Sequence, residues 1–204
     1  MWLLLIPTLA LAATFNDSFT RADSNNDLGA NWTDAISVGL GINSNRAYSA
    51  TPGASRASWV TGTTQTAAQY IQGTINDVGS SRYFTFMLRG SGADGTRAAY
   101  EVSVGGTNEL YIEEVAAGTG TNLATGSFTL ANGDVVRAEA EGTALRLKIN
   151  GTTRLSTTDG TLTSGLTGLS IYHDSGLPTI DNVEAGDIGG GGGGTGIILK
   201  RRKH

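Results

Sequence analysis

The sequence predicts an antiparallel β-sandwich. Between residues 14 and 187, apolar and polar residues alternate with a period of two, and a helical period is hard to find. About a dozen short candidate strands follow one another closely, separated by turns rich in glycine. Glycine makes up 30 of the 204 residues. Because the strands are half polar, we expect one face of each sheet to meet solvent.

The clearest candidate strand is residues 82–89. Its apolar face holds Phe84, Phe86 and Leu88, and its other face holds Tyr83, Thr85, Met87 and Arg89. In the strand that follows, Tyr100, Val102 and Val104 share a face. The candidate strands in chain order are residues 56–60, 68–75, 82–89, 99–104, 109–115, 134–140, 143–149, 152–156, 169–173 and 179–184.

Asn150-Gly151 is the strongest turn signal in the chain. It stands between two candidate strands, and both residue types tolerate the positive φ that a two-residue hairpin turn requires. We therefore predict a hairpin at this position.

Composition excludes several kinds of site. The absence of cysteine excludes disulfides, cysteine nucleophiles and thiolate zinc sites, and two histidines are too few for a multi-histidine metal centre. All 18 acidic residues lie between Asp17 and Asp187, together with ten of the 14 basic residues, so this body is strongly acidic. Nucleic-acid binding needs a basic face, and we expect no nucleic-acid partner for the body.

Residues 1–12 form a candidate secretory signal peptide. The run from Trp2 to Ile6 is apolar, and Ala10-Leu11-Ala12 fits the small-x-small pattern that precedes a cleavage site. About a dozen apolar residues are too few to cross a bilayer as a helix, which needs about 20. No lysine or arginine precedes the apolar run, so an apolar first strand or a docking anchor is the alternative.

Residues 188–204 form a candidate linker and tail, which leaves residues 13–187 as the sandwich domain. The six glycines from Gly189 to Gly194 sustain neither helix nor strand, because glycine loses the most backbone entropy on ordering. A short apolar cluster and then Lys200 to Lys203 follow, too few residues for a membrane span. We expect a disordered end, and the alternative is that its basic residues bind an acidic partner, a lipid headgroup or a nucleic acid.

Short motifs occur in a particular order along the domain. They are Phe15-Asn-Asp-Ser-Phe19, Arg21-Ala-Asp23, Leu28-Gly29, Asn31-Trp32 and residues 133–142, 145–151, 158–159, 165–172 and 180–186. This order resembles bacterial and phage members of the concanavalin A-like lectin/glucanase superfamily, which includes laminin-G-like domains. The resemblance covers nearly all of residues 14–187 and implies a jelly-roll sandwich.

The resemblance also implies a protein that lies outside the cell or on a particle. We therefore expect a non-enzymatic jelly-roll domain that is secreted or displayed on a particle and that binds glycan, a surface polymer or another surface. The alternative is a structural component of a virion or extracellular assembly that docks on neighbouring subunits through its tail. Fold alone does not decide between these functions.

A glycoside hydrolase is the less expected function because the acid motif of such enzymes is missing. Hydrolases of this superfamily carry alternating acids on one strand, as in Glu-x-Asp-x-x-Glu, and no such run occurs here. Glu113 and Glu114 are adjacent and point to opposite faces, whereas Glu139 and Glu141 share a face. Glu139 and Glu141 are thus a candidate catalytic pair, the alternative being two strand carboxylates beside arginines.

The resemblance implies a structural calcium ion where the two ends of the domain meet. Calcium prefers carboxylate and carbonyl oxygens. Asp17 and Asp181, one near each end of the domain, are the candidate ligands, with Asn182 as a weaker third. The alternative is that the two aspartates cap turns.

A glycan site needs an aromatic ring for the C–H face of a sugar and polar side chains for its hydroxyls. We expect Tyr100 and Tyr111, on neighbouring strands, to supply the rings. Arg89, Glu101 and Tyr172 are the candidate ligand-binding residues near them. The alternative is that large rings such as Tyr100 lie in the core, as is common in sandwiches.

Overall fold

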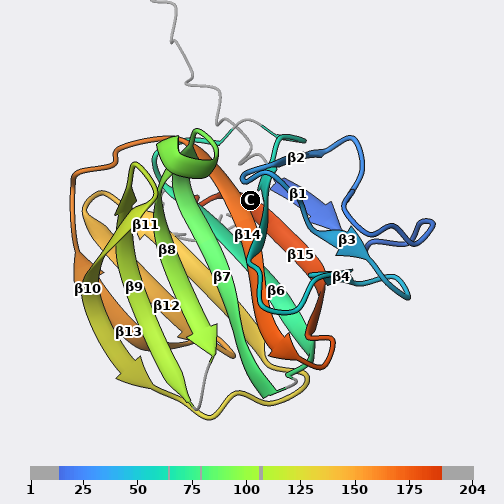
Figure 1. Cartoon of the computed structure of the whole chain (residues 1–204). Coiled ribbons are helices and arrows are strands. Elements are labelled where there is room, and N and C mark those ends of the chain that lie inside the picture. The colour runs from blue at the N-terminus through green and yellow to red at the C-terminus, as the bar shows by residue number, and fades with distance from the viewer. Residues whose placement is uncertain (1–13, 64, 79, 106–107, 190–204) are drawn as a thin grey trace, which may run out of the picture.

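Two antiparallel sheets face each other in the computed structural model of the chain (Figure 1). The structure describes residues 14–63, 65–78, 80–105 and 108–189. Every strand pairing among them is antiparallel, and the only helix among them is one turn of 3-10 helix, η1 (Asp94–Thr96). The predicted antiparallel β-sandwich is confirmed.

The larger sheet has eight strands in the order β13-β12-β11-β6-β15-β4-β3, and β1 also pairs with β15. These strands are β1 (Thr14–Asp17), β3 (Gly41–Ile42), β4 (Ala47–Tyr48), β6 (Gln69–Asp77), β11 (Val135–Glu141), β12 (Ala144–Ile149), β13 (Thr152–Thr158) and β15 (Thr179–Asp187).

The smaller sheet has seven strands in the order β10-β9-β8-β7-β14-β5-β2. These strands are β2 (Trp32–Asp34), β5 (Arg56–Val60), β7 (Ser80–Ser91), β8 (Ala98–Gly105), β9 (Glu109–Ala116), β10 (Thr119–Ser127) and β14 (Leu166–Ser175). In Figure 1 the outer face of this sheet is turned to the viewer.

The core lies between the two sheets and is built from the apolar faces of the long strands. Phe84, Phe86 and Leu88 of β7 are fully buried there, as their alternation predicted. Leu147 of β12 and Ile180 of β15 belong to the same cluster from the larger sheet. Full burial of such a side chain stabilises by about 1.5–3 kcal/mol. A one-residue slip of a strand would expose its whole apolar set, so the core pins the register.

The structure contains strands that the alternation did not indicate. β10 is the longest of them, and nearly all of its residues are at least partly exposed because it is the edge of the smaller sheet. An edge strand with little burial on either face has no need for apolar residues at every second position. β1 to β4 are two to four residues long, too short to show a period.

The predicted hairpin at Asn150-Gly151 is present. It joins β12 to β13, and the two residues have φ of 51° and 77°. These are the positive angles for which the turn selects asparagine and glycine.

The predicted signal peptide, residues 1–12, lies outside the described residues. So does the predicted tail from residue 190 onward. No helix in the described ranges is long and apolar enough to cross a membrane.

The packing of Gly168 in β14 generates a stability prediction. A Cβ added there would lie 2.5 Å from Trp59 Cε3, 2.7 Å from Met87 Cε and 2.8 Å from the Ser58 carbonyl oxygen. We expect Gly168→Ala to lower the free energy of unfolding by about 1–3 kcal/mol, measured by urea denaturation. In Gly95→Ala the new Cβ meets nothing within 4 Å, so this control should change stability by less than about 0.5 kcal/mol. Equal stability of the two variants would contradict this packing.

Candidate functional site: a tyrosine-lined pocket on the smaller sheet

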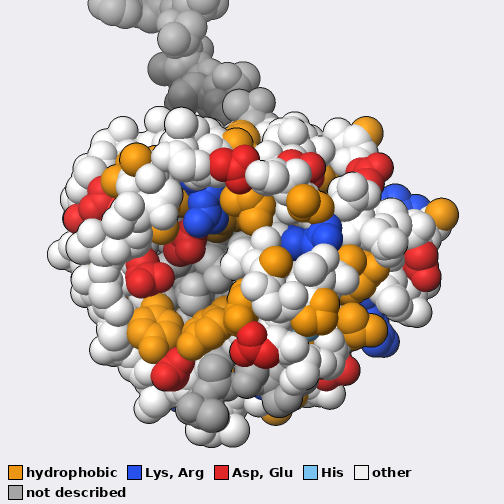
Figure 2. Space-filling view, in the orientation of Figure 1, with side chains coloured by type: hydrophobic (Ala, Val, Ile, Leu, Met, Phe, Trp, Pro, Cys, Tyr) orange, Lys and Arg blue, Asp and Glu red, His pale blue; other side chains and the backbone are white. Residues whose placement is uncertain are grey.

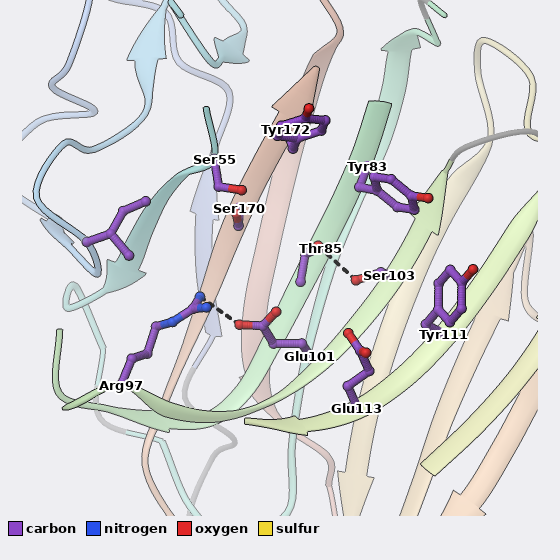
Figure 3. Close-up of a pocket in the computed structure, with 11 residues that line it drawn as sticks. Ser55, Tyr83, Thr85, Arg97, Glu101, Ser103, Tyr111, Glu113, Ser170 and Tyr172 are labelled. Atoms are coloured by element: carbon purple, nitrogen blue, oxygen red, sulfur yellow. Dashed lines mark hydrogen bonds and ion pairs between the residues drawn. The ribbon is translucent and has the colours of Figure 1, made fainter. Parts of the chain in front are cut away.

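A hollow of about 310 Å³ lies on the outer face of the smaller sheet, over β14, β7, β8 and β9 (Figure 2). We call it the tyrosine pocket. It is lined by Ile36, Ser55, Tyr83, Thr85, Arg97, Glu101, Ser103, Tyr111, Glu113, Ser170 and Tyr172 (Figure 3).

Strand register brings the polar side chains of the pocket together. Residues that alternate with the buried core positions point outward, and residues directly opposite each other on paired strands share a face. Two rows therefore cross the strands: Tyr172 beside Tyr83, and Ser170 beside Thr85, Ser103 and Tyr111.

Three tyrosine rings form the aromatic part of the pocket. Tyr83 stands between Tyr111 and Tyr172, with ring centroids 6.3 Å and 6.4 Å away. Its hydroxyl donates a hydrogen bond to Glu109 Oε2 at 2.6 Å, and this bond together with burial raises the pKa of Tyr83 to about 12. A hydrogen bond to Asp174, followed by burial, likewise raises the pKa of Tyr172. The anchored, neutral rings can offer apolar faces to a ligand.

Short hydroxyl side chains occupy the middle of the pocket. Thr85 Oγ1 and Ser103 Oγ lie 2.8 Å apart, and Ser170 is the neighbour of Thr85 on β14. Because these side chains are small, they leave space above the sheet. Their hydroxyl groups can both donate and accept hydrogen bonds.

Two carboxylates face each other in the pocket. Glu101 on β8 and Glu113 on β9 are directly opposite residues. Arg97 Nη1 lies 2.6 Å from Glu101 Oε1, yet burial raises the pKa of Glu101; Arg97 opposes the rise and Glu113 adds to it. The Glu113 carboxylate forms no hydrogen bond or ion pair with any residue that the structure describes. Like charges in directly opposite positions repel.

Two loops close the end of the pocket that lies toward β5. Ile36 and Ser55 come from these loops and line the pocket. Asp94 holds the first loop by accepting hydrogen bonds from the backbone N–H and the hydroxyl of Ser37, both at 2.8 Å. A small apolar cluster supports Ile36 on the outer face of the sheet: Ala35, Ala57, Trp59, Met87 and Ala99.

The structure brings three of the five predicted ligand-binding residues into one pocket. Tyr111, Glu101 and Tyr172 all line it. Arg89 and Tyr100 do not, and both are buried elsewhere.

Arg89 does not share a face with Tyr83, contrary to the alternation of the strand. The pairing of β7 with β8 shifts between Leu88 and Ser91, and Arg89 adopts φ of 52°, so the period of two is broken there. The guanidinium donates hydrogen bonds to the carbonyl oxygens of Ala67, Leu162 and Gly142 at 2.8–3.0 Å. This buried side chain joins loops and leaves no donor directed into the pocket.

Tyr100 lies in the core, which is the position that we gave as the alternative to ligand binding. Its side chain is fully buried, its hydroxyl donates a hydrogen bond to Asp159, and it accepts one from the N–H of Leu162 at 2.9 Å. Burial, followed by the bond to Asp159, raises the pKa of Tyr100 to about 12. A ring with no exposed surface has no face to offer to a sugar.

Sequence reasoning missed several residues of the pocket, above all Glu113 and Arg97. Glu113 carried a signal, because Glu109, Tyr111 and Glu113 alternate along one strand and so share a face. Arg97 lies before β8, and Ile36 and Ser55 lie in loops. No alternation pattern covers these positions.

The candidate catalytic pair Glu139 and Glu141 lies on the larger sheet, away from the tyrosine pocket. Glu139 Oε1 lies 2.7 Å from Arg137 Nε and 2.9 Å from Lys148 Nζ, and Glu141 Oε2 lies 3.0 Å from Arg146 Nη1. Burial acts to raise the pKa of Glu139, but the bonds from Lys148 and Arg137 outweigh it and lower the pKa. These carboxylates lie beside basic side chains, which is the arrangement that we gave as the alternative to a catalytic pair.

The predicted calcium ligands lie where the two ends of the domain meet, because β1 pairs with β15. The carboxylate of Asp17 already accepts hydrogen bonds from Arg21, Trp32 and the N–H of Phe19, at 2.7–2.8 Å. Asp181 accepts one from the N–H of the next residue. Within the described ranges, no group of three or more His, Asp or Glu gathers. A cation at Asp17 would have to displace Arg21, and calcium binding stays a prediction.

Comparison with known proteins places the fold. No protein-family model matches the sequence, and no relative was found among curated proteins. Solved structures do match. A carbohydrate-binding module, CBM66, from Bacillus subtilis has a TM-score of 0.61 at 14% identity, covering 76% of this chain and 94% of that one.

Two further structures match over most of their length. A protein of unknown function with a galectin-like fold from Bacillus subtilis has a TM-score of 0.66 at 10% identity, covering 87% of this chain and 98% of that one. A β-1,3-1,4-glucanase (lichenase) derived from a mouse hindgut metagenome has a TM-score of 0.58 at 11% identity, covering 85% and 98%. These likenesses show that the chain shares a β-sandwich fold with these proteins, which is the fold that the sequence resemblance implied.

The contacts of Asp17 generate a prediction about pH. Burial acts to raise its pKa, but the bonds from Arg21 and Trp32 outweigh it and lower the pKa. A carboxyl with a lowered folded-state pKa stabilises the fold above its unfolded pKa, and this contribution is lost as the pH falls through the folded pKa. Asp17→Asn should therefore unfold at lower urea concentration at neutral pH, and the difference from the parent should shrink below about pH 4. A difference that is constant with pH would contradict this account.

Proposed function

We propose that this chain binds a glycan in the tyrosine pocket. The observation that carries the proposal is the presence of three tyrosine rings, hydroxyl groups and carboxylates in a single hollow of about 310 Å³, the size of a small ligand site. A sugar ring has an apolar C–H face and a rim of hydroxyls. Tyr83, Tyr111 and Tyr172 suit the C–H face, whereas Thr85 and Glu113 suit the hydroxyls.

The likeness to a carbohydrate-binding module supports this proposal, because that protein has the same fold at 14% identity. The likeness is one of fold, so the argument for this chain rests on its own pocket. We propose that binding is non-catalytic and that the partner is a glycan or surface polymer. We also propose that the protein is secreted or displayed on a particle, which the apolar segment 1–12 supports.

A substitution of Tyr111 tests the proposal. Tyr111 lies beside Tyr83 and lines the pocket, and Tyr111→Ala removes the ring whereas Tyr111→Phe keeps it. We expect the full-length protein to bind a defined class of sugar on a glycan array. On that sugar, affinity gel electrophoresis should show a loss of about tenfold or more for Tyr111→Ala, with the affinity of Tyr111→Phe within about threefold of the parent.

Two results would contradict the proposal. A folded parent protein that binds no sugar of the array would contradict glycan binding for those sugars. Binding that is unchanged in Tyr111→Ala would place the glycan elsewhere on the molecule.

One observation favours a second activity, glycoside hydrolysis. Glu101 and Glu113 face each other, and burial raises the pKa of Glu101. Two neighbouring carboxyl groups, one of which has a raised pKa, are the kind of pair that glycoside hydrolysis uses. Against it, Arg97 lies 2.6 Å from Glu101 and favours the charged form of that carboxyl.

A reducing-sugar assay on the polysaccharides that the protein binds separates the two activities. We expect no release of reducing ends, because the ion pair with Arg97 favours the charged form of Glu101 over the protonated acid that the reaction needs. Hydrolysis that is abolished in Glu101→Gln and in Glu113→Gln, but retained in Glu114→Gln, would show an enzyme instead. Glu114 is adjacent in β9 and has the parity of the core-facing Ile112, so it controls for charge.

A further inference from the structure

We propose that the tyrosine pocket selects its glycan by charge and prefers a sugar that carries a protonated amine. The inference rests on the proposed function and names the class of sugar: amino sugars rather than neutral sugars or uronic acids.

Acidic groups outnumber basic ones around the pocket. Of its lining residues, Glu101 and Glu113 are acidic and Arg97 alone is basic. Glu109 adds another carboxylate at the Tyr83 hydroxyl, and Asp174 adds one at the Tyr172 hydroxyl. Figure 2 shows acidic side chains around the hollow. The summed field favours a positive ligand and opposes a negative one.

The contacts of each acidic group single out Glu113. Glu101 is held by Arg97, and Glu109 accepts a hydrogen bond from Tyr83. Glu113 lines the pocket, and its carboxylate forms no hydrogen bond or ion pair with any residue that the structure describes. It is therefore the carboxylate in the pocket that is free to accept a hydrogen bond from a ligand.

An ammonium group beside Glu113 would relieve the repulsion between the two facing carboxylates. Glu101 and Glu113 are opposite residues, and Glu113 adds to the rise in the pKa of Glu101. A positive group between them interacts favourably with both. A uronic acid would bring a further negative charge to the same place.

The rings add a second attraction for the same group. Tyr111 lies two residues from Glu113 on the same face of β9, and Figure 3 shows both side chains in the pocket. A cation over a tyrosine ring is attracted by the negative face of the ring. A sugar stacked on Tyr111 can thus place an amine within reach of Glu113. A neutral sugar has no positive charge and gains neither attraction.

Calorimetric titration of the full-length protein with three tetrasaccharides tests the inference. The probes are β-1,4-linked glucosamine, its N-acetylated counterpart and galacturonic acid, at low salt and at a mildly acidic pH where the sugar amine is protonated. We expect the glucosamine tetramer to bind about tenfold more tightly than the N-acetylated one, with no binding of the galacturonic acid tetramer. The preference should weaken as salt is added.

Matched variants locate the effect. Glu113→Gln should reduce the preference for the amine to about twofold or less, whereas Glu114→Gln should keep it. Both variants lose one negative charge from β9, but Glu114 has the parity of the core-facing Ile112.

Several outcomes would overturn the inference. They are equal affinity for the amine and its acetylated form, binding of galacturonic acid, or a preference that survives in Glu113→Gln. A lysine tetramer that binds as tightly as glucosamine would show a general cation site rather than a sugar site. Failure of these probes alongside a positive glycan array would overturn the charge preference alone, whereas a blank array would overturn glycan binding as well.

Discussion

Burial of one face of β7 between the sheets is the constraint on which the rest of the structure depends. Phe84, Phe86 and Leu88 are fully buried, so the period of two sends Tyr83 and Thr85 to the outer face. Antiparallel pairing fixes which residues of β14, β8 and β9 point outward as well, because directly opposite residues share a face. The tyrosine pocket is thus the reverse side of the core. A slip in register would turn its tyrosines inward and its apolar residues outward.

Carboxylates on the outer faces of the two sheets differ in how well basic side chains compensate their charge. This contrast supports a ligand site on the smaller sheet. On the larger sheet Glu139 is 4% exposed, basic side chains surround it, and their hydrogen bonds lower its pKa. In the tyrosine pocket, burial raises the pKa of Glu101, and Glu113 opposite it has no partner among the described residues. Uncompensated charge costs stability, and proteins tend to retain such costs at functional sites.

Strand alternation was sufficient for part of the site and insufficient for the rest. The sequence offered Tyr111 as a sugar-binding ring on a candidate strand, and the structure puts Tyr111 in the pocket. Alternation grouped Tyr100 with the apolar residues Val102 and Val104. Tyr100 is therefore buried in the core and not exposed to a ligand, because this face of the strand points toward the opposite sheet. Alternation predicted that Arg89 shares a face with Tyr83, which is wrong. The pairing of β7 with β8 shifts after Leu88 and turns Arg89 to the other face, and no local sequence pattern indicates that shift. The loop residue Ile36 had no periodic signal at all.

Alternation and turn residues were enough to predict a β-sandwich, the buried face of β7 at Phe84, Phe86 and Leu88, and the hairpin at Asn150. These properties are local, because side chains alternate along a strand and turn residues act through their own φ. Only the tertiary structure decided that Glu101 faces Glu113, that Arg97 reaches Glu101 and that a loop places Ile36 against the sheet. Glu101 and Glu113, like Ile36 and the strands beneath it, are far apart in the sequence, and such contacts form only when burial of a shared core offsets the entropy of closing the intervening chain. Arg97 and Glu101 are four residues apart, but Arg97 lies before β8, where no alternation pattern applies.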